Sequence, residues 1–266
     1  MIYALTDVSK CFASVTALEG VSFGVKQGEQ VGVLGPSGSG KSTLFRLLNA
    51  TLRPSSGSLS FDGNDTTTMS SDTLRLMRRR TATIYQQHNL VPSLTALENT
   101  LSGALGRWSL WHTLRNNILP AREDAERALD ALQLVSLAEK RHTRASELSG
   151  GQQQRVAIAR ALMQSPDVIL ADEPIASLDP ELSRSILDLL VRIAGDGGRT
   201  LIVALHSVEL AREYMPRLVG LQQGKVFFDA SPPEIAMDQW RCLYSASSPM
   251  DDRLPDEARR RRPRCS

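Results

Sequence analysis

A glycine-rich segment at residues 35–43 has residue types and spacing that suit the binding of a phosphate group. It consists of Gly35, Pro36, Ser37, Gly38, Ser39, Gly40, Lys41, Ser42 and Thr43. Glycines let the backbone turn its N–H groups toward phosphate oxygens, the lysine adds a positive charge, and the hydroxyl after it can bind Mg²⁺. An apolar run at 31–34 precedes the segment and a helical pattern at 44–48 follows it. This context predicts a site for ATP or GTP.

Two adjacent acids, Asp172 and Glu173, follow the apolar run 168–171. A buried strand tolerates neighbouring carboxylates only at its end, where an ion and water offset their desolvation. Neighbouring residues of a strand point in different directions, so we expect Asp172 to bind Mg²⁺ and Glu173 to polarise the attacking water. The alternative is a pair of acids at the N-terminus of a helix that begins near Pro174.

A second glycine motif, at residues 148–152, precedes a helical pattern. It consists of Leu148, Ser149, Gly150, Gly151 and Gln152. The start of a helix offers free N–H groups and a positive dipole end, so this segment is physically another element that can bind phosphate. One nucleotide cannot easily reach both glycine motifs of a single chain. We call 35–43 the phosphate loop and 148–152 the signature segment.

Together, the two motifs resemble those of the ATP-binding-cassette (ABC) family over about residues 2–235. The resemblance implies a head-to-tail dimer in which Ser149 and Gly151 of one copy cap the γ-phosphate that Lys41 of the other copy holds. It implies further positions: Gln86 at Mg²⁺ and the attacking water, His206 at the γ-phosphate, and a loop across the dimer interface. That loop is formed by Ser177, Leu178 and Asp179.

Two of the implied positions have alternatives. Phe12 stands where the family has an aromatic residue that stacks on adenine, more often tyrosine, and a core phenylalanine is the competing interpretation. Gln87 lies beside Gln86 and could take its place. The other histidines are expected to be surface or core residues, and none has metal-ligand spacing with another.

Periodicity predicts the fold class. Apolar runs at 31–34, 82–85, 168–171 and 201–205 read as strands buried on both faces, as in a parallel sheet. Helical spacing dominates 125–135, and 217–229 reads as a hairpin that turns at Gly224. With the resemblance, this predicts an α/β P-loop NTPase of RecA-like type, with a mainly parallel sheet, an antiparallel β subdomain and an inserted α-helical subdomain.

The predicted domain organisation is an ATPase domain over 1–240 followed by a flexible, arginine-rich tail over 241–266. Within the domain, the catalytic core comprises about 1–88 and 160–240, and the helical subdomain about 89–159. The tail segment 251–266 holds six arginines and four acids, so it accounts for the whole formal charge of +2. A neutral body argues against a nucleic-acid partner.

The composition of the chain excludes several classes of protein. The 266 residues are 41% hydrophobic and 23% charged, which excludes disordered and fibrous classes. No run approaches the roughly 18 apolar residues of a membrane span. The three cysteines are far apart, so neither a disulfide framework nor a zinc site is expected.

A finer resemblance, carried by 85–91, 94–99, 103–107, 171–180 and 223–229, is to the ATPase subunits of phosphonate importers. It implies ATP and Mg²⁺ as cofactors, a second copy and a membrane permease as partners, an external solute-binding protein acting indirectly, and a location on the cytoplasmic face of the inner membrane. Importers of phosphate, amino acids or metal chelates, soluble ABC ATPases, and P-loop kinases are the alternatives. Trp108 and Trp111 suggest a groove for a permease helix within 106–120, or subdomain packing.

Overall fold

The computed structural model describes residues 1–107, 121–176 and 178–245. Two sheets organise this part of the chain. The larger has the strand order β10-β9-β3-β8-β7-β6, in which β9, β3, β8, β7 and β6 run parallel and β10 is antiparallel. The smaller is antiparallel, with the order β2-β1-β4-β5. This arrangement confirms the predicted fold class.

The strands of the larger sheet lie where the apolar runs predict them. They are β3 (Gln30–Leu34), β6 (Thr81–Ile84), β7 (Val168–Asp172), β8 (Thr200–Leu205), β9 (Arg217–Gln222) and β10 (Lys225–Ala230). All six residues of β8 are buried, because alternate side chains enter cores on opposite faces of the sheet. The smaller sheet comprises β1 (Tyr3–Phe12), β2 (Val15–Val25), β4 (Ser56–Phe61) and β5 (Asn64–Asp65).

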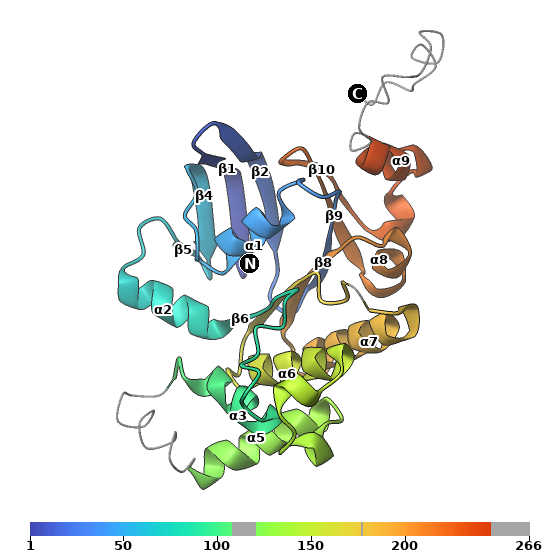
Figure 1. Cartoon of the computed structure of the whole chain (residues 1–266). Helices are drawn as coiled ribbons and strands as arrows, with labels where there is room; N and C mark the ends of the chain where they lie inside the picture. Colours follow the sequence, from blue (N-terminus) through green and yellow to red (C-terminus); the bar gives the residue numbers. More distant parts are fainter. Residues whose placement is uncertain (108–120, 177, 246–266) are drawn as a thin grey trace.

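Helices cover both faces of the larger sheet (Figure 1). Between this sheet and the smaller one lie α1 (Lys41–Leu48) and α2 (Ser71–Arg80). The other side carries α3 (Ala96–Leu101), α5 (Arg122–Leu134), α6 (Gly150–Leu162), α7 (Pro180–Asp196) and α8 (Val208–Tyr214). The described ranges also hold four short 3₁₀ turns: η1 (Ser102–Ala104), η2 (Ala138–Lys140), η3 (Ala145–Glu147) and η4 (Pro232–Glu234).

Local sequence explains where the helices that position the site begin. Ser149 and Gln152 form a reciprocal capping box at the start of α6. Asp179 caps α7, its Oδ1 accepting the N–H of Leu182 at 2.9 Å, and Pro180 occupies the first helical position. These caps satisfy backbone N–H groups that would otherwise lack partners, so each helix starts at a defined residue.

The chain end differs from the expected tail. Helix α9 (Met237–Ser245) continues beyond the expected domain end at residue 240, and Leu243 within it is completely buried. Its burial against the sheet makes α9 part of the folded domain, and the rest of the predicted tail lies outside the described residues.

Within the described ranges, no helix combines the length and the apolar character needed to cross a bilayer.

Candidate nucleotide site

The phosphate loop connects the end of β3 to the start of α1, and its backbone requires glycine. Gly38 and Gly40 have φ angles of +80° and +103°, which side-chain-bearing residues rarely adopt. A Cβ atom at Gly40 would lie 2.6 Å from the carbonyl oxygen of Ala17. The loop therefore packs directly against the hairpin of β1 and β2, which fixes its shape.

Lys41 is held inside this loop with only 4% of its side chain exposed. Its Nζ donates to the carbonyl oxygens of Gly35 at 2.7 Å and Pro36 at 3.2 Å. Burial lowers the pKa of Lys41, and the nearby carboxylates of Glu173 and Asp172 oppose that shift. The ammonium group is thus preorganised at the centre of the loop, where a phosphate would meet it.

Asp172 is the last residue of β7, and one of its carboxylate oxygens lacks a partner. Its Oδ1 is inaccessible to solvent and accepts no hydrogen bond, although the side chain of Ser42 hydrogen-bonds to the carboxylate. Burial raises the pKa of Asp172, and the neighbouring Glu173 raises it further. An unsatisfied carboxylate oxygen beside a serine hydroxyl is a pair of hard oxygen donors, so these residues fit Mg²⁺. In the described ranges no cluster of three or more His, Cys, Asp or Glu suits a transition metal.

Glu173 and His206 meet at the edge of the sheet where the neighbouring strands β7 and β8 end. The Nε2 of His206 lies 2.5 Å from Oε1 of Glu173, which is also 3.8 Å from Nζ of Lys41. Glu173 has a φ of +53°, a strained conformation typical of functional positions. The alternative of a helix N-terminus at Pro174 is wrong, because the next helix begins only at Pro180.

These groups surround a cleft of about 480 Å³. Its lining residues are Val15, Thr16, Ala17, Ser37, Gly38, Ser39, Gly40, Lys41, Ser42, Thr43, Gln86, Glu173 and His206. Gln86 lines the cleft and Gln87 does not. The structure therefore favours Gln86 over Gln87 as the glutamine of the nucleotide site. Sequence reasoning missed residues 15–17, because nothing in their composition distinguishes them from other strand residues.

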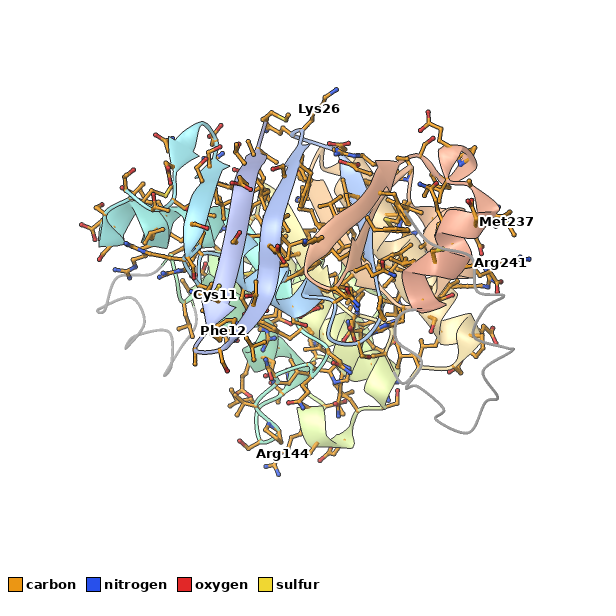
Figure 2. The ribbon with its side chains drawn as sticks, turned by 90° about the horizontal axis from the view of Figure 1, so that it is seen from above. Cys11, Phe12, Lys26, Arg144, Met237 and Arg241 are labelled. Atoms are coloured by element: carbon orange, nitrogen blue, oxygen red, sulfur yellow. The ribbon has the colours of Figure 1, made fainter. Side chains whose placement is uncertain are left out.

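Phe12 lies at the end of β1, as Figure 2 shows, and does not line this cleft. Its side chain is 39% exposed, and the Nζ of Lys10 lies 5.3 Å from the ring centre. The alternative of a core phenylalanine is therefore wrong. Its exposed ring beside the hairpin remains free to stack on a base.

The signature segment lies elsewhere on the molecule. None of its residues lines the cleft, and in Figure 1 α6 and α1 are on opposite sides of the larger sheet. Leu148 is buried, whereas Ser149 and Gly150 are exposed. A Cβ at Gly151 would lie 2.4 Å from Cδ2 of Leu182, so α6 starts in close contact with α7. The two glycine motifs of one chain are not brought together.

Two of the remaining predicted residues lie directly before α7. Leu178 packs against the core and Asp179 caps the helix, while Ser177 lies outside the described residues, as do Trp108 and Trp111. A contact that the sequence did not predict comes from Tyr244 in α9, whose hydroxyl donates to the carbonyl oxygen of His206 at 3.1 Å.

Comparisons with known proteins identify the family. The family model described as ABC transporter matches residues 18–176. The chain is 46% identical over 233 residues to the phosphonates import ATP-binding protein PhnC 1 of Rhodopseudomonas palustris, covering 88% of this chain and 86% of that protein. It is 43% identical to a phosphonates import ATP-binding protein of Haloarcula marismortui, covering 89% and 87%.

Solved structures of similar fold belong to the same family. A dimeric cassette, MJ0796, superposes with a TM-score of 0.76 at 34% identity, over 86% of this chain and 98% of that one. A post-hydrolysis state of the same cassette, bound to ADP and Pi, superposes with a TM-score of 0.73. The glycine motifs, the fold and these relatives lead to one conclusion: the chain belongs to the ABC transporter family of ATP-binding proteins.

Proposed function

We propose that this chain is the ATP-hydrolysing subunit of an ABC importer that drives the uptake of phosphonates or related organophosphorus anions. The observation that carries the ATPase assignment is the convergence of Lys41, Glu173 and His206 on one cleft. The substrate class is supported by the relatives, which are named as phosphonate import proteins. A membrane permease and an external solute-binding protein are the partners this role requires, and the cytoplasmic face of the inner membrane is its location.

In the proposed reaction, water attacks the γ-phosphorus of ATP in line with the leaving group. Glu173 accepts a hydrogen bond from the attacking water and orients it, while His206 holds the glutamate in place through the Nε2–Oε1 contact. Lys41 and the backbone N–H groups of the phosphate loop stabilise negative charge on the phosphate oxygens. Phe12 stacks on the adenine.

Ser42, Gln86 and Asp172 would hold Mg²⁺, which neutralises charge that develops on the phosphates. The signature segment of a second copy supplies the groups that the cleft lacks, with Ser149 and Gly151 at the γ-phosphate. The loop at residues 177–179 crosses the interface between the copies. Closure of two chains around two ATP molecules would then move the helical part of each chain and, with it, the permease.

The substitution Glu173→Gln tests the ATPase assignment. It keeps the shape of the side chain and removes its charge, so ATP binding should persist while turnover falls by about 10²–10⁴-fold. Dimers trapped with ATP should then accumulate, which light scattering can measure. Glu181→Gln, an exposed change in the first turn of α7, is the matched control. Unchanged turnover in Glu173→Gln would remove Glu173 from the reaction.

The substrate class needs a transport measurement. Reconstituted with the permease and the binding protein, the chain should accelerate phosphonate uptake and hydrolyse ATP faster when phosphonate is supplied. Uptake of phosphate, amino acids or metal chelates instead would contradict the phosphonate assignment and leave the ATPase assignment intact.

A further inference from the structure

Four arginines line a small cavity between α2 and η1, and no acidic residue of the described ranges lines it. The cavity has a volume of about 220 Å³ and shares no residue with the nucleotide cleft. Its lining consists of Arg75, Arg78 and Arg79 from α2, Gly103, Gly106, Arg107 and Gln164. Figure 1 shows α2, which carries three of these arginines, above α3.

These arginines differ from the arginines that stabilise the fold. Arg80, Arg184 and Arg217 each pair with two carboxylates. None of the cavity arginines forms an ion pair with any residue in the described ranges. The neighbouring segment 108–120 contains no aspartate or glutamate. Four like charges close together repel one another, so an anion between them would be stabilised.

Three of the four guanidinium groups are already held in place. Arg78 donates to the carbonyl oxygen of Ala50 at 3.1 Å, Arg79 donates to that of Gly106, and Arg107 donates to the hydroxyl of Ser165 at 3.2 Å. Each group keeps further N–H donors for another acceptor. Arg75 makes no hydrogen bond to any described residue. Three of the four arginines are thus ordered, and they keep N–H donors for a ligand.

Gln164 adds a complementary feature. Its Oε1 is inaccessible to solvent and accepts no hydrogen bond. A buried acceptor without a donor costs free energy, which a hydroxyl group placed in the cavity would recover. An anion that also carries a hydroxyl group, such as a glycerol phosphodiester, would satisfy both the arginines and this oxygen.

We propose that this cavity binds a phosphate group, and that the group belongs to the headgroup of an anionic phospholipid. Phosphate oxygens accept paired N–H groups from arginine, so one phosphate group can engage several guanidinium groups at once. Leu76 and Leu105, which are 53% and 44% exposed, lie next to lining residues in the chain. A basic cavity with apolar neighbours suits the surface of a bilayer. The inference does not depend on the proposed transport function.

The double substitution Arg75→Gln/Arg79→Gln tests the cavity. Binding to vesicles of phosphatidylglycerol and phosphatidylcholine should weaken about thirtyfold, since each arginine near an anionic surface contributes on the order of 1 kcal/mol. The control, Arg144→Gln/Arg241→Gln, makes the same change in net charge at two exposed residues far from each other in Figure 2. Its binding should change by less than about threefold, because separated surface charges are screened.

The same proteins, saturated with ADP so that the phosphate loop is filled, distinguish the source of the phosphate group. Vesicle binding that millimolar inorganic phosphate does not displace identifies the lipid headgroup. If inorganic phosphate binds saturably and only the cavity variant loses that binding, the ligand is free phosphate. The cavity would then still be a phosphate site, but the lipid headgroup would not be its ligand. Equal losses in both variants, or no binding of either probe by the unmodified chain, would overturn the proposal. Unchanged thermal unfolding shows that the variants fold.

A second inference rests on α9 and on the proposed ATPase reaction. The Tyr244 hydroxyl donates to the carbonyl oxygen of His206 at 3.1 Å, and the backbone of Gly35 hydrogen-bonds to the same phenol. Helix α9 is anchored by Trp240, whose ring meets that of Phe228 edge-on at 5.5 Å. We infer that Tyr244 is a positioning residue, which fixes the backbone of His206 relative to the start of the phosphate loop.

Tyr244→Phe removes only the hydroxyl group. With loss of a hydrogen bond worth about 1 kcal/mol, kcat for ATP hydrolysis should fall about fivefold while KM for ATP stays within about twofold. Tyr214→Phe, on α8 and outside the cleft, is the control. An unchanged kcat, or a loss of kcat with an equal loss of thermal stability, would overturn this role. If the unmodified chain hydrolyses no ATP, the proposed function fails instead.

Discussion

Mixing two differently substituted copies tests whether each ATP site is divided between two chains. Lys41→Ala removes the charge from the cleft, and Ser149→Ala removes the hydroxyl group from the signature segment. If each cleft is completed by the other copy, a mixed dimer has one site with both defects and one with neither. If equal amounts exchange at random, half of the dimers are mixed and each holds one intact site, so activity returns to at most about a quarter of the unmodified rate.

Ser149 also has a structural role that the experiment must separate. Its Oγ accepts the N–H of Gln152 at 3.4 Å as the N-cap of α6. Loss of such a cap costs about 1 kcal/mol, independently of any ATP contact. Ser70→Ala is a matched control, since Ser70 caps α2 in the same way by accepting the N–H of Thr73 at 3.2 Å. It should lose similar stability and keep its ATPase activity.

Phosphate release is measured for each parent and for the mixture at the same total protein concentration. Recovery well above both parents is the expected result, because only a divided site lets one defect complement the other. A mixture that gives merely the mean of its parents would refute the divided site. So would a Ser149→Ala protein as active as the Ser70→Ala control.

Three further predictions follow from local geometry. Gly40→Ala should weaken nucleotide binding at least about tenfold, because its Cβ would meet the carbonyl oxygen of Ala17 at 2.6 Å on a backbone of positive φ; an unchanged affinity in a fluorescent-nucleotide titration would contradict this. Burial raises the pKa of Asp172 above its ordinary value of 3.8, so the folded state keeps a proton that the unfolded state loses. The free energy of unfolding should therefore fall as pH rises from the unfolded-state pKa to the raised folded-state pKa. Asp172→Asn should remove that fall in urea unfolding without Mg²⁺. Gly151→Ala should cost about 1–3 kcal/mol by displacing Leu182, and a smaller residue at 182 should restore part of the loss.

The parts of the site that lie on strands and the phosphate loop could be predicted from the sequence. A run such as 168–171 is apolar at every position, so both faces of its strand must be covered, and the acids that follow must emerge at the sheet edge. The glycines of the loop are required by local backbone conformation. In both cases a few neighbouring residues determine the structure.

Contacts between distant segments could not be predicted in the same way. Helix α9 carries apolar residues at helical spacing, Met237, Trp240 and Leu243, but it is short and lies beside the serine- and proline-rich end of the chain. Its docking depends on Phe228 and on Gln222, whose Nε2 donates to the carbonyl oxygen of Cys242 at 2.6 Å. Those partners are specified by the tertiary fold rather than by local sequence.

Helix α6 connects the two halves of the divided site within one chain. Its N-terminus is the signature segment, and farther along it Arg160 donates to the carbonyl oxygens of His88 at 2.8 Å and Asn89 at 2.6 Å. Those carbonyls belong to the segment that begins with Gln86 at the nucleotide cleft. A rigid helix therefore joins the residues that we propose meet the partner's ATP to Gln86, which we propose reaches the chain's own ATP. Binding at either cleft then alters the position of groups needed at the other, so the two hydrolysis events in a dimer should be coupled.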